Sequence, residues 1–203
     1  MVLGSSVITI DGPAGAGKST VARLLAQRLG FRVLDTGAMY RAAAWTARSL
    51  GITDPKEIAR RIEHDGLDSG IPDEELRRPE ITAAVRPIAD SPECRTALVR
   101  LQREAARGGG MVTEGRDQGS VVFPDADLKV YLDASLPVRA RRRHRDEGGD
   151  LAAIEDAIAR RDAADRARPV GALVRPEGAL EIDSSGLTPQ EVVDRILAAF
   201  GGP

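Results

Sequence analysis

The chain has 203 residues, a length that fits one domain or one domain with a small insertion. Hydrophobic residues make up 42% and aromatic residues only 3%, and the formal net charge is −2, which gives no general attraction to nucleic acid. The single cysteine, Cys94, excludes an internal disulfide, and no apolar run approaches the ~20 residues that span a bilayer. We therefore expect a cytoplasmic protein with no nucleic-acid or membrane partner.

A glycine-rich loop joins the first predicted strand, residues 8–10, to a predicted helix over residues 20–29. The loop matches the pattern G-x-x-x-x-G-K-[ST], in which backbone N–H groups and the start of a helix surround phosphate oxygens. In this pattern Lys18 reaches the β- and γ-phosphates, and the Ser19 hydroxyl coordinates Mg²⁺. The alternative is a strand-to-helix turn without a ligand. The predicted phosphate-binding residues are Gly12, Pro13, Ala14, Gly15, Ala16, Gly17, Lys18, Ser19 and Thr20.

The next part of the chain completes a strand–helix–strand unit and then changes character. Residues 31–34 are a predicted strand, and a helix is expected through residues 42–50, so the sheet should be parallel. Residues 53–107 contain no convincing strand. They are predicted to form a helical insertion, with helices at about 55–64, 73–86 and 92–107 that are interrupted by Pro72, Pro79, Pro87 and Pro92.

The remaining strands alternate with helices. Residues 111–113, 128–132 and 179–182 are predicted strands, and Thr188 and Pro189 are the expected N-cap and first residue of a final helix. The pattern predicts an α/β fold with a doubly wound, five-stranded parallel sheet. We expect a core of 1–52, 108–136 and 169–203, the insertion at 53–107, and a lid with its following helix at 137–168.

Charged residues follow the predicted strands, at the edge where parallel sheets bind ligands. Glu114 follows the third strand and is a candidate to orient a water on Mg²⁺, although it could be an ordinary surface acid. Arg116 and Asp117 adjoin it, with a simple salt-bridged pair as the alternative.

The helix expected at 151–168 carries an apolar stripe, Leu151, Ile154 and Ile158, which continues in the same spacing as charged residues. A helix that leaves the core for a polar cleft would change in this way. Arginines suit phosphate oxygens, and the carboxylate suits a sugar hydroxyl or an arginine. The alternative is an exposed ion-pair ladder. The charged residues of the stripe are Arg161, Asp165 and Arg168.

Five arginines lie within residues 139–145. We interpret this run as a mobile flap that closes over a transferring phosphoryl group and neutralises its charge. A solvated helix face or an RNA-binding surface is the alternative.

Several blocks of the chain, taken together, resemble the bacterial cytidylate kinases, a family of nucleoside monophosphate kinases with the P-loop NTPase fold. The blocks run nearly from end to end. They are Ile8–Pro13 before the phosphate loop, Leu34–Arg41, Glu114–Asp117 with Gly119–Ala126, Leu132–Ser135, Arg161–Arg168 and Ile182–Ser184.

The resemblance implies Mg²⁺-dependent transfer of the ATP γ-phosphoryl group to CMP or dCMP by a monomeric enzyme. It implies substrate contacts from Thr36, Tyr40, Arg41, Arg95, Arg116, Asp117, Arg161, Asp165 and Arg168. Catalytic roles would fall to Lys18, Arg139, Arg142, Arg143 and Arg168.

The chain departs from the family pattern in the region that would select the base. The stretch before residue 75 is short, and Arg86 occupies a position where the family has a small hydroxyl residue. Gln118 is also unusually polar for its position. Two alternatives therefore remain: a kinase for another or a modified nucleoside monophosphate, and a nucleotide-binding switch or interaction protein without an acceptor.

Overall fold

The computed structural model describes residues 6–68 and 70–201, which divide into two compact units. One unit combines the chain up to Leu34 with the chain from Gly108 onward, and the other is Asp35–Arg107. None of the helices in the described residues is long and apolar enough to cross a membrane.

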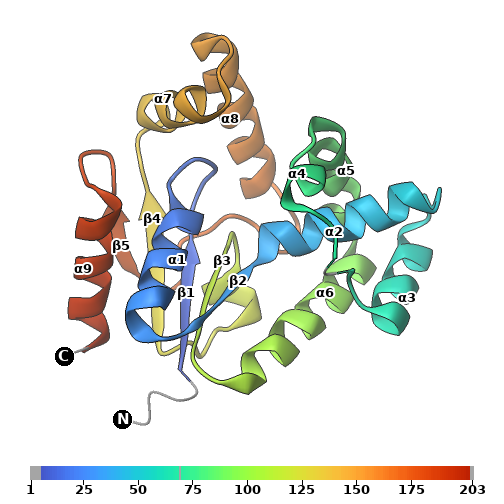
Figure 1. The fold of residues 1–203 in the computed structure, drawn as a ribbon, viewed down its shortest axis with the longest axis horizontal. Coiled ribbons are helices and arrows are strands. Elements are labelled where there is room, and N and C mark those ends of the chain that lie inside the picture. The colour runs from blue at the N-terminus through green and yellow to red at the C-terminus, as the bar shows by residue number, and fades with distance from the viewer. Residues whose placement is uncertain (1–5, 69, 202–203) are drawn as a thin grey trace. The chain divides into compact units, whose positions relative to one another are not determined.

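The first unit is built on a sheet whose strand order is β2-β3-β1-β4-β5 (Figure 1). β1 pairs in parallel with β3 and β4, and β4 pairs in parallel with β5. The α/β fold predicted from the sequence is confirmed, and each predicted strand is present. The strands are β1 Val7–Asp11, β2 Arg32–Asp35, β3 Met111–Gly115, β4 Leu128–Asp133 and β5 Leu180–Asp183.

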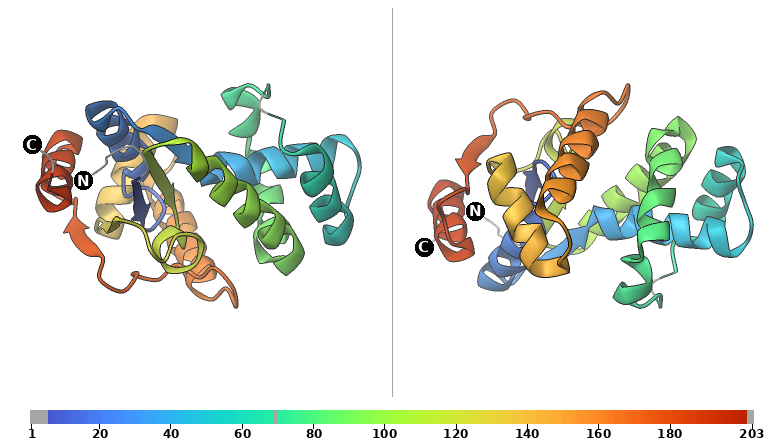
Figure 2. Two further views of the ribbon diagram at one scale, coloured as in Figure 1. Left: turned by 90° about the horizontal axis from the view of Figure 1, so that it is seen from below. Right: turned by 90° about the horizontal axis from the view of Figure 1, so that it is seen from above.

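Helices α1 (Lys18–Leu29) and α9 (Pro189–Phe200) contribute to the core of this unit. Their apolar faces pack with the inward residues of the central strands, which are buried almost throughout, as expected for parallel strands covered on both faces. Helices α7 (Leu136–Glu147) and α8 (Leu151–Arg166) pack on each other beyond the carboxyl end of β4 (Figures 1 and 2).

The second unit is helical and has its own apolar core, which includes Ile58, Ile62, Ile81, Leu98 and Cys94. Helix α2 packs on α5, and α3 packs on α6. The helices are α2 Thr36–Ser49, α3 Pro55–Asp65, α4 Asp73–Leu76, α5 Pro79–Asp90 and α6 Pro92–Ala105, followed by the 3₁₀ turn Ala106–Gly108.

The prediction of one helix over 73–86 was wrong. The chain forms α4, then restarts at Pro79, which occupies the first turn of α5, where its missing N–H group costs nothing. Helix α5 continues through Pro87 because burial of Ile81, Ile88 and Ala89 outweighs the roughly 3 kcal/mol cost of an interior proline. The compact unit also contains α2, whereas the predicted insertion began at residue 53; that domain boundary stays a prediction.

Candidate active site

The phosphate loop leaves the end of β1 beside β4. Gly12 has a φ of +153°, and a Cβ at this position would lie 2.0 Å from the carbonyl oxygen of Leu132, so no side chain fits. Gly17 ends the loop in the left-handed conformation as the N-cap of α1, with no side-chain capping bond. The first turn of α1 therefore offers uncapped N–H groups to an anion.

Lys18, the first residue of α1, is buried at this loop, and its Nζ donates a hydrogen bond to the carbonyl oxygen of Pro13 at 2.8 Å. Desolvation and the positive charge of Arg116 lower the pKa of Lys18 to about 7, against the opposing effect of Glu114. The positive charge of Arg161 lowers the pKa further. A bound triphosphate would favour the charged amine.

Ser19 and Glu114 meet at the ends of neighbouring elements. Strands β1 and β3 are paired in register, with Ile10 opposite Glu114, and the Ser19 Oγ donates a hydrogen bond to Glu114 Oε1 at 2.8 Å. The described residues contain no group of three or more histidine, cysteine or acidic side chains that could hold a metal ion. A hydroxyl and one carboxylate, both oxygen donors, fit Mg²⁺, which keeps several waters and binds largely through substrate phosphates.

Asp165 lies near three arginines, Arg116, Arg161 and Arg168, and binds two of them. Arg116 Nε donates to Asp165 Oδ2 at 2.8 Å, and Arg168 Nη2 pairs with Asp165 Oδ1 at 2.8 Å. Asp165 is therefore engaged with arginines, one of the two roles that the sequence left open. Arg161 makes no hydrogen bond or ion pair with any part of the chain that the structure describes.

Arg161 differs from its neighbours in environment as well. Arg161 is exposed, yet desolvation by the surrounding protein and the charge of Arg116 lower its pKa to about 10. The guanidinium groups of Arg116, Arg161 and Arg168, gathered near Asp165, suit a phosphate.

The buried face of α8 differs from the predicted stripe. Ile158, Asp162 and Asp165 are buried, whereas Leu151 is exposed, so Asp162 rather than Arg161 continues the face below Ile158. Asp162 was missed by the sequence analysis, although its spacing of four from Ile158 is the signal that could have indicated it.

The arginines of α7 lie in three different environments. Arg139 is buried and bound to Asp162, and Arg142 Nη2 donates to the carbonyl oxygen of Ser184 at 2.6 Å. Arg143 forms an exposed pair with Glu147 on its own helix. The structure thus buries Arg139, leaves Arg142 and Arg143 half-buried, and exposes Arg141 and Arg145.

Asp11, at the end of β1, was not predicted as a site residue. It is fully buried and accepts hydrogen bonds from the N–H groups of Gln118 and Gly119 at 2.8 and 2.7 Å. Burial raises the pKa of Asp11 to about 7, although the two backbone hydrogen bonds oppose the shift. Asp11 thus holds the π-helical turn Gln118–Val122, which follows Asp117, against the start of the phosphate loop.

In the second unit, the predicted site residues lie on α2 and α6. Asp35 caps α2 and lies 3.7 Å from Arg41 Nη2, whose Nε is buried without a hydrogen-bond partner among the described residues. Arg95, on α6, is buried and donates from Nη1 to the Tyr40 hydroxyl at 3.1 Å. Thr36 is buried at the start of α2. By contrast, Arg86 is exposed on α5 and lies 3.4 Å from Asp90.

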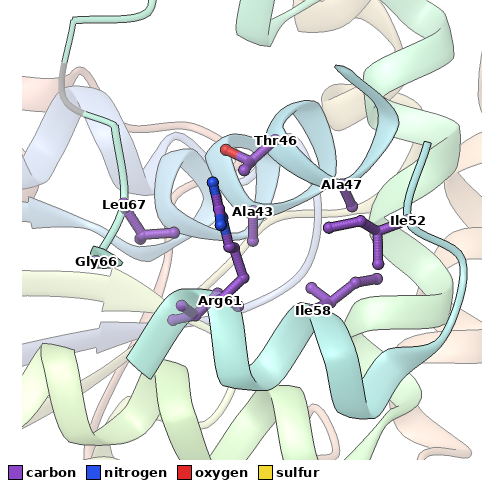
Figure 3. Close-up of a pocket in the computed structure, with 9 residues that line it drawn as sticks. Ala43, Thr46, Ala47, Ile52, Ile58, Arg61, Gly66 and Leu67 are labelled. Atoms are coloured by element: carbon purple, nitrogen blue, oxygen red, sulfur yellow. The ribbon is translucent and has the colours of Figure 1, made fainter. Parts of the chain in front are cut away.

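A hollow in the second unit is separate from these residues (Figure 3). It lies between α2 and α3 and has a cavity volume of only about 10 Å³, far below the ~300 Å³ at which ligand pockets usually begin. Its lining is largely apolar, and Arg61 there pairs with Asp65 on its own helix. We do not assign it to a nucleotide. The lining residues are Ala43, Thr46, Ala47, Ile52, Ile58, Arg61, Ile62, Gly66 and Leu67.

Comparison with known proteins gives a consistent result. The family model described as cytidylate kinase matches residues 8–201. A cytidylate kinase from Rhodopirellula baltica is 43% identical over 207 residues, which cover 94% of this chain and 90% of the relative. One from Symbiobacterium thermophilum is 46% identical over 212 residues, which cover 94% of each chain.

Solved structures support the fold alone. A gluconokinase from Sinorhizobium meliloti has a TM-score of 0.53 at 19% identity, covering 97% of this chain and 92% of its own. A shikimate kinase from Bacteroides thetaiotaomicron has a TM-score of 0.52 at 14% identity, covering 97% and 98%.

Proposed function

Because the chain belongs to the cytidylate kinase family, we infer that it transfers the γ-phosphoryl group of ATP to CMP or dCMP and releases ADP with CDP or dCDP. The observation in the structure that most supports this function is the proximity of two sites within the first unit. Gly115 pairs with Asp11 at the start of the phosphate loop, and the next residue, Arg116, binds Asp165 in the arginine cluster. A nucleotide switch needs the loop but has no use for a second guanidinium site beside it.

We propose that the phosphate loop, residues 12–20, holds the donor. Lys18 would leave the Pro13 carbonyl for the β- and γ-phosphates, and the N–H groups at the start of α1 would bind the same oxygens. Ser19 would coordinate Mg²⁺ directly and Glu114 through water. A Mg²⁺ ion held there would supply positive charge that offsets the negative charge of the phosphates.

Guanidinium groups would hold the acceptor. Arg161 and Arg168 would bind its phosphate or ribose, with Asp165 fixing Arg168 and Arg116 in place. Thr36, Tyr40 and Arg41 would line the phosphate site, and Arg95 and Asp117 would face the base. Catalysis would rest on positioning and charge neutralisation, with Arg142 and Arg143 as the candidate lid arginines, and without a covalent intermediate.

The test is ADP release in a coupled assay with Mg²⁺ and CMP, dCMP, UMP, AMP or dTMP as acceptor, with Lys18→Ala as the control. Release with CMP and dCMP alone is the expected result. Release without any acceptor would identify a nucleotide switch. Preference for another acceptor would show that the region around Arg86 selects a base other than cytosine. A monomeric state and a cytoplasmic location stay predictions; sedimentation velocity and fractionation test them.

A further inference from the structure

Both backbone polar groups of Ala14, in the phosphate loop, are bound by side chains from α7 and α8. The Ala14 N–H group donates to Asp162 Oδ1 at 3.2 Å, and the Ala14 carbonyl oxygen accepts from Arg139 Nη1 at 2.9 Å. The two side chains also bond to each other, Arg139 Nη1 to Asp162 Oδ2 at 2.6 Å. The three residues form a closed ring of hydrogen bonds, which we call the Ala14 ring.

The Ala14 ring is buried and has little freedom. Arg139 is 6% exposed and Asp162 is 2% exposed. Arg139 Nε also donates to the carbonyl oxygen of Ala134 at 2.8 Å, so both Nε and Nη1 are engaged by protein acceptors. Removing one member would leave the other buried and unpaired, which is strongly unfavourable.

The residues next to Ala14 bring α7 closer still to the loop. Gly15 has a φ of +79°, and a Cβ there would lie 3.1 Å from the Cβ of Arg139. Arg142 Nη1 contacts the carbonyl oxygen of Ala16 at 3.3 Å. Guanidinium groups of α7 thus hold the carbonyl groups on both sides of Gly15.

Holding these carbonyl groups matters for an anion site. A peptide that turned over would direct a carbonyl dipole toward the phosphates in place of an N–H group, and the site would repel the anion. The Ala14 N–H group is already bound to Asp162, so within the predicted loop it serves to fix the backbone rather than to bind phosphate.

We propose that Arg139 and Asp162 are positioning residues that set the conformation of the phosphate loop and couple it to helices α7 and α8. Arg139 therefore acts on ATP binding through Ala14, and it is not one of the arginines that touch the transferring phosphoryl group. The functional readout of this inference rests on the proposed kinase activity, whereas its structural readout does not.

The test uses Asp162→Asn, which keeps the shape of the side chain but removes its charge, and Arg139→Lys, which keeps the charge but removes the guanidinium fork. For each variant we would measure ATP binding by calorimetry without acceptor, KM for ATP and for CMP, and amide hydrogen exchange of residues 12–20. We expect ATP binding weaker by about tenfold or more, faster exchange in the loop, and a nearly unchanged KM for CMP. Glu181→Gln, which breaks the exposed Arg175–Glu181 pair, is the matched control and should change none of these.

The outcomes are distinct. A lower kcat with unchanged ATP binding and unchanged loop exchange would overturn the inference. It would mean that Arg139 contacts the transferring phosphoryl group instead. If either single variant fails to unfold cooperatively, Arg139→Met combined with Asp162→Leu replaces the pair by apolar groups and is judged by the same loop exchange and ATP binding. If the unsubstituted protein binds ATP but phosphorylates no CMP, the proposed function fails while binding and exchange still decide the role of the Ala14 ring.

Discussion

Arg161 is the guanidinium group most available to a substrate in the cluster around Asp165, because its neighbours Arg116 and Arg168 both bond to that carboxylate. Arg161→Ala therefore removes a ligand contact without breaking a pair within the protein. We expect kcat/KM for CMP to fall by about 10- to 100-fold, while ATP affinity stays nearly unchanged. Steady-state kinetics with each nucleotide varied in turn measures both effects.

Arg160→Ala is the matched control, because Arg160 is exposed on the same helix one position earlier and faces a different direction. It should leave both KM values unchanged. An equal loss of ATP affinity in Arg161→Ala would place Arg161 at the donor site instead.

Asp11 should make stability depend on pH. Burial raises its pKa from 3.8 to about 7 in the folded protein, where the backbone N–H groups of Gln118 and Gly119, the carboxylate of Asp117 and the amine of Lys18 surround it. Between these two values the folded carboxyl keeps a proton that the unfolded chain has lost, so its contribution to stability is greatest near pH 4 and declines toward pH 7.

Asp11→Asn removes this titration. The free energy of unfolding of the unsubstituted protein, relative to Asp11→Asn, should fall by at least about 1 kcal/mol between pH 4 and pH 7, as measured by urea unfolding. A constant difference across this range would show that the buried carboxyl does not titrate there.

The start of helix α9 is defined by its local sequence. Thr188 was the predicted N-cap, and its Oγ1 accepts a hydrogen bond from the N–H group of Glu191. The Glu191 carboxylate in turn accepts a hydrogen bond from the N–H group of Thr188 at 2.8 Å. Thr188→Ala should cost about 1 kcal/mol and lower Tm by roughly 2–4 °C. Thermal unfolding followed by circular dichroism measures the shift.

Gln190→Ala is the control for this prediction, since Gln190 is exposed in the same turn and takes no part in the capping bonds. Equal shifts in the two variants would mean that the cap contributes nothing beyond helix propensity.

In helix α5, burial outweighs the local sequence preference. Pro87 led to the expectation that the helix ends at residue 86. The helix continues to Asp90 because Ile88 is buried in the core of the second unit and Ala89 is buried beside it in the sequence. Local preference was overruled by burial, which the sequence around a proline does not reveal.

Each of the two units contains residues that are predicted to bind the acceptor. CMP should therefore slow amide hydrogen exchange at residues 36–41 of the second unit as well as at residues 161–168 of the first, because each contributes predicted ligands. Exchange followed by mass spectrometry with saturating CMP tests this, with inorganic phosphate as the control. Protection confined to one unit would mean that this unit binds the acceptor without the other.

The sequence by itself determined the features whose contacts are local. The phosphate loop, the five strands and the cap of α9 each carry their own glycines, β-favouring runs or capping side chains within a few residues. The position of Glu114 beside Ser19 also followed from the sequence, because parallel strands bring their carboxyl ends to one edge of the sheet.

Only the tertiary structure decided which member of a run of similar residues turns inward. Five arginines within residues 139–145 were equivalent in the sequence, and the fold buries Arg139 against Asp162 while leaving Arg141 and Arg145 exposed. Asp162 and Asp11 were missed for the same reason. The partners of Asp162 lie 23 and 148 positions away, and those of Asp11 lie 107 and 108 positions away. Such bonds form only after packing has brought distant segments together and excluded water. The spacing of Asp162 from Ile158 could therefore indicate a buried position but not the partners of its carboxylate.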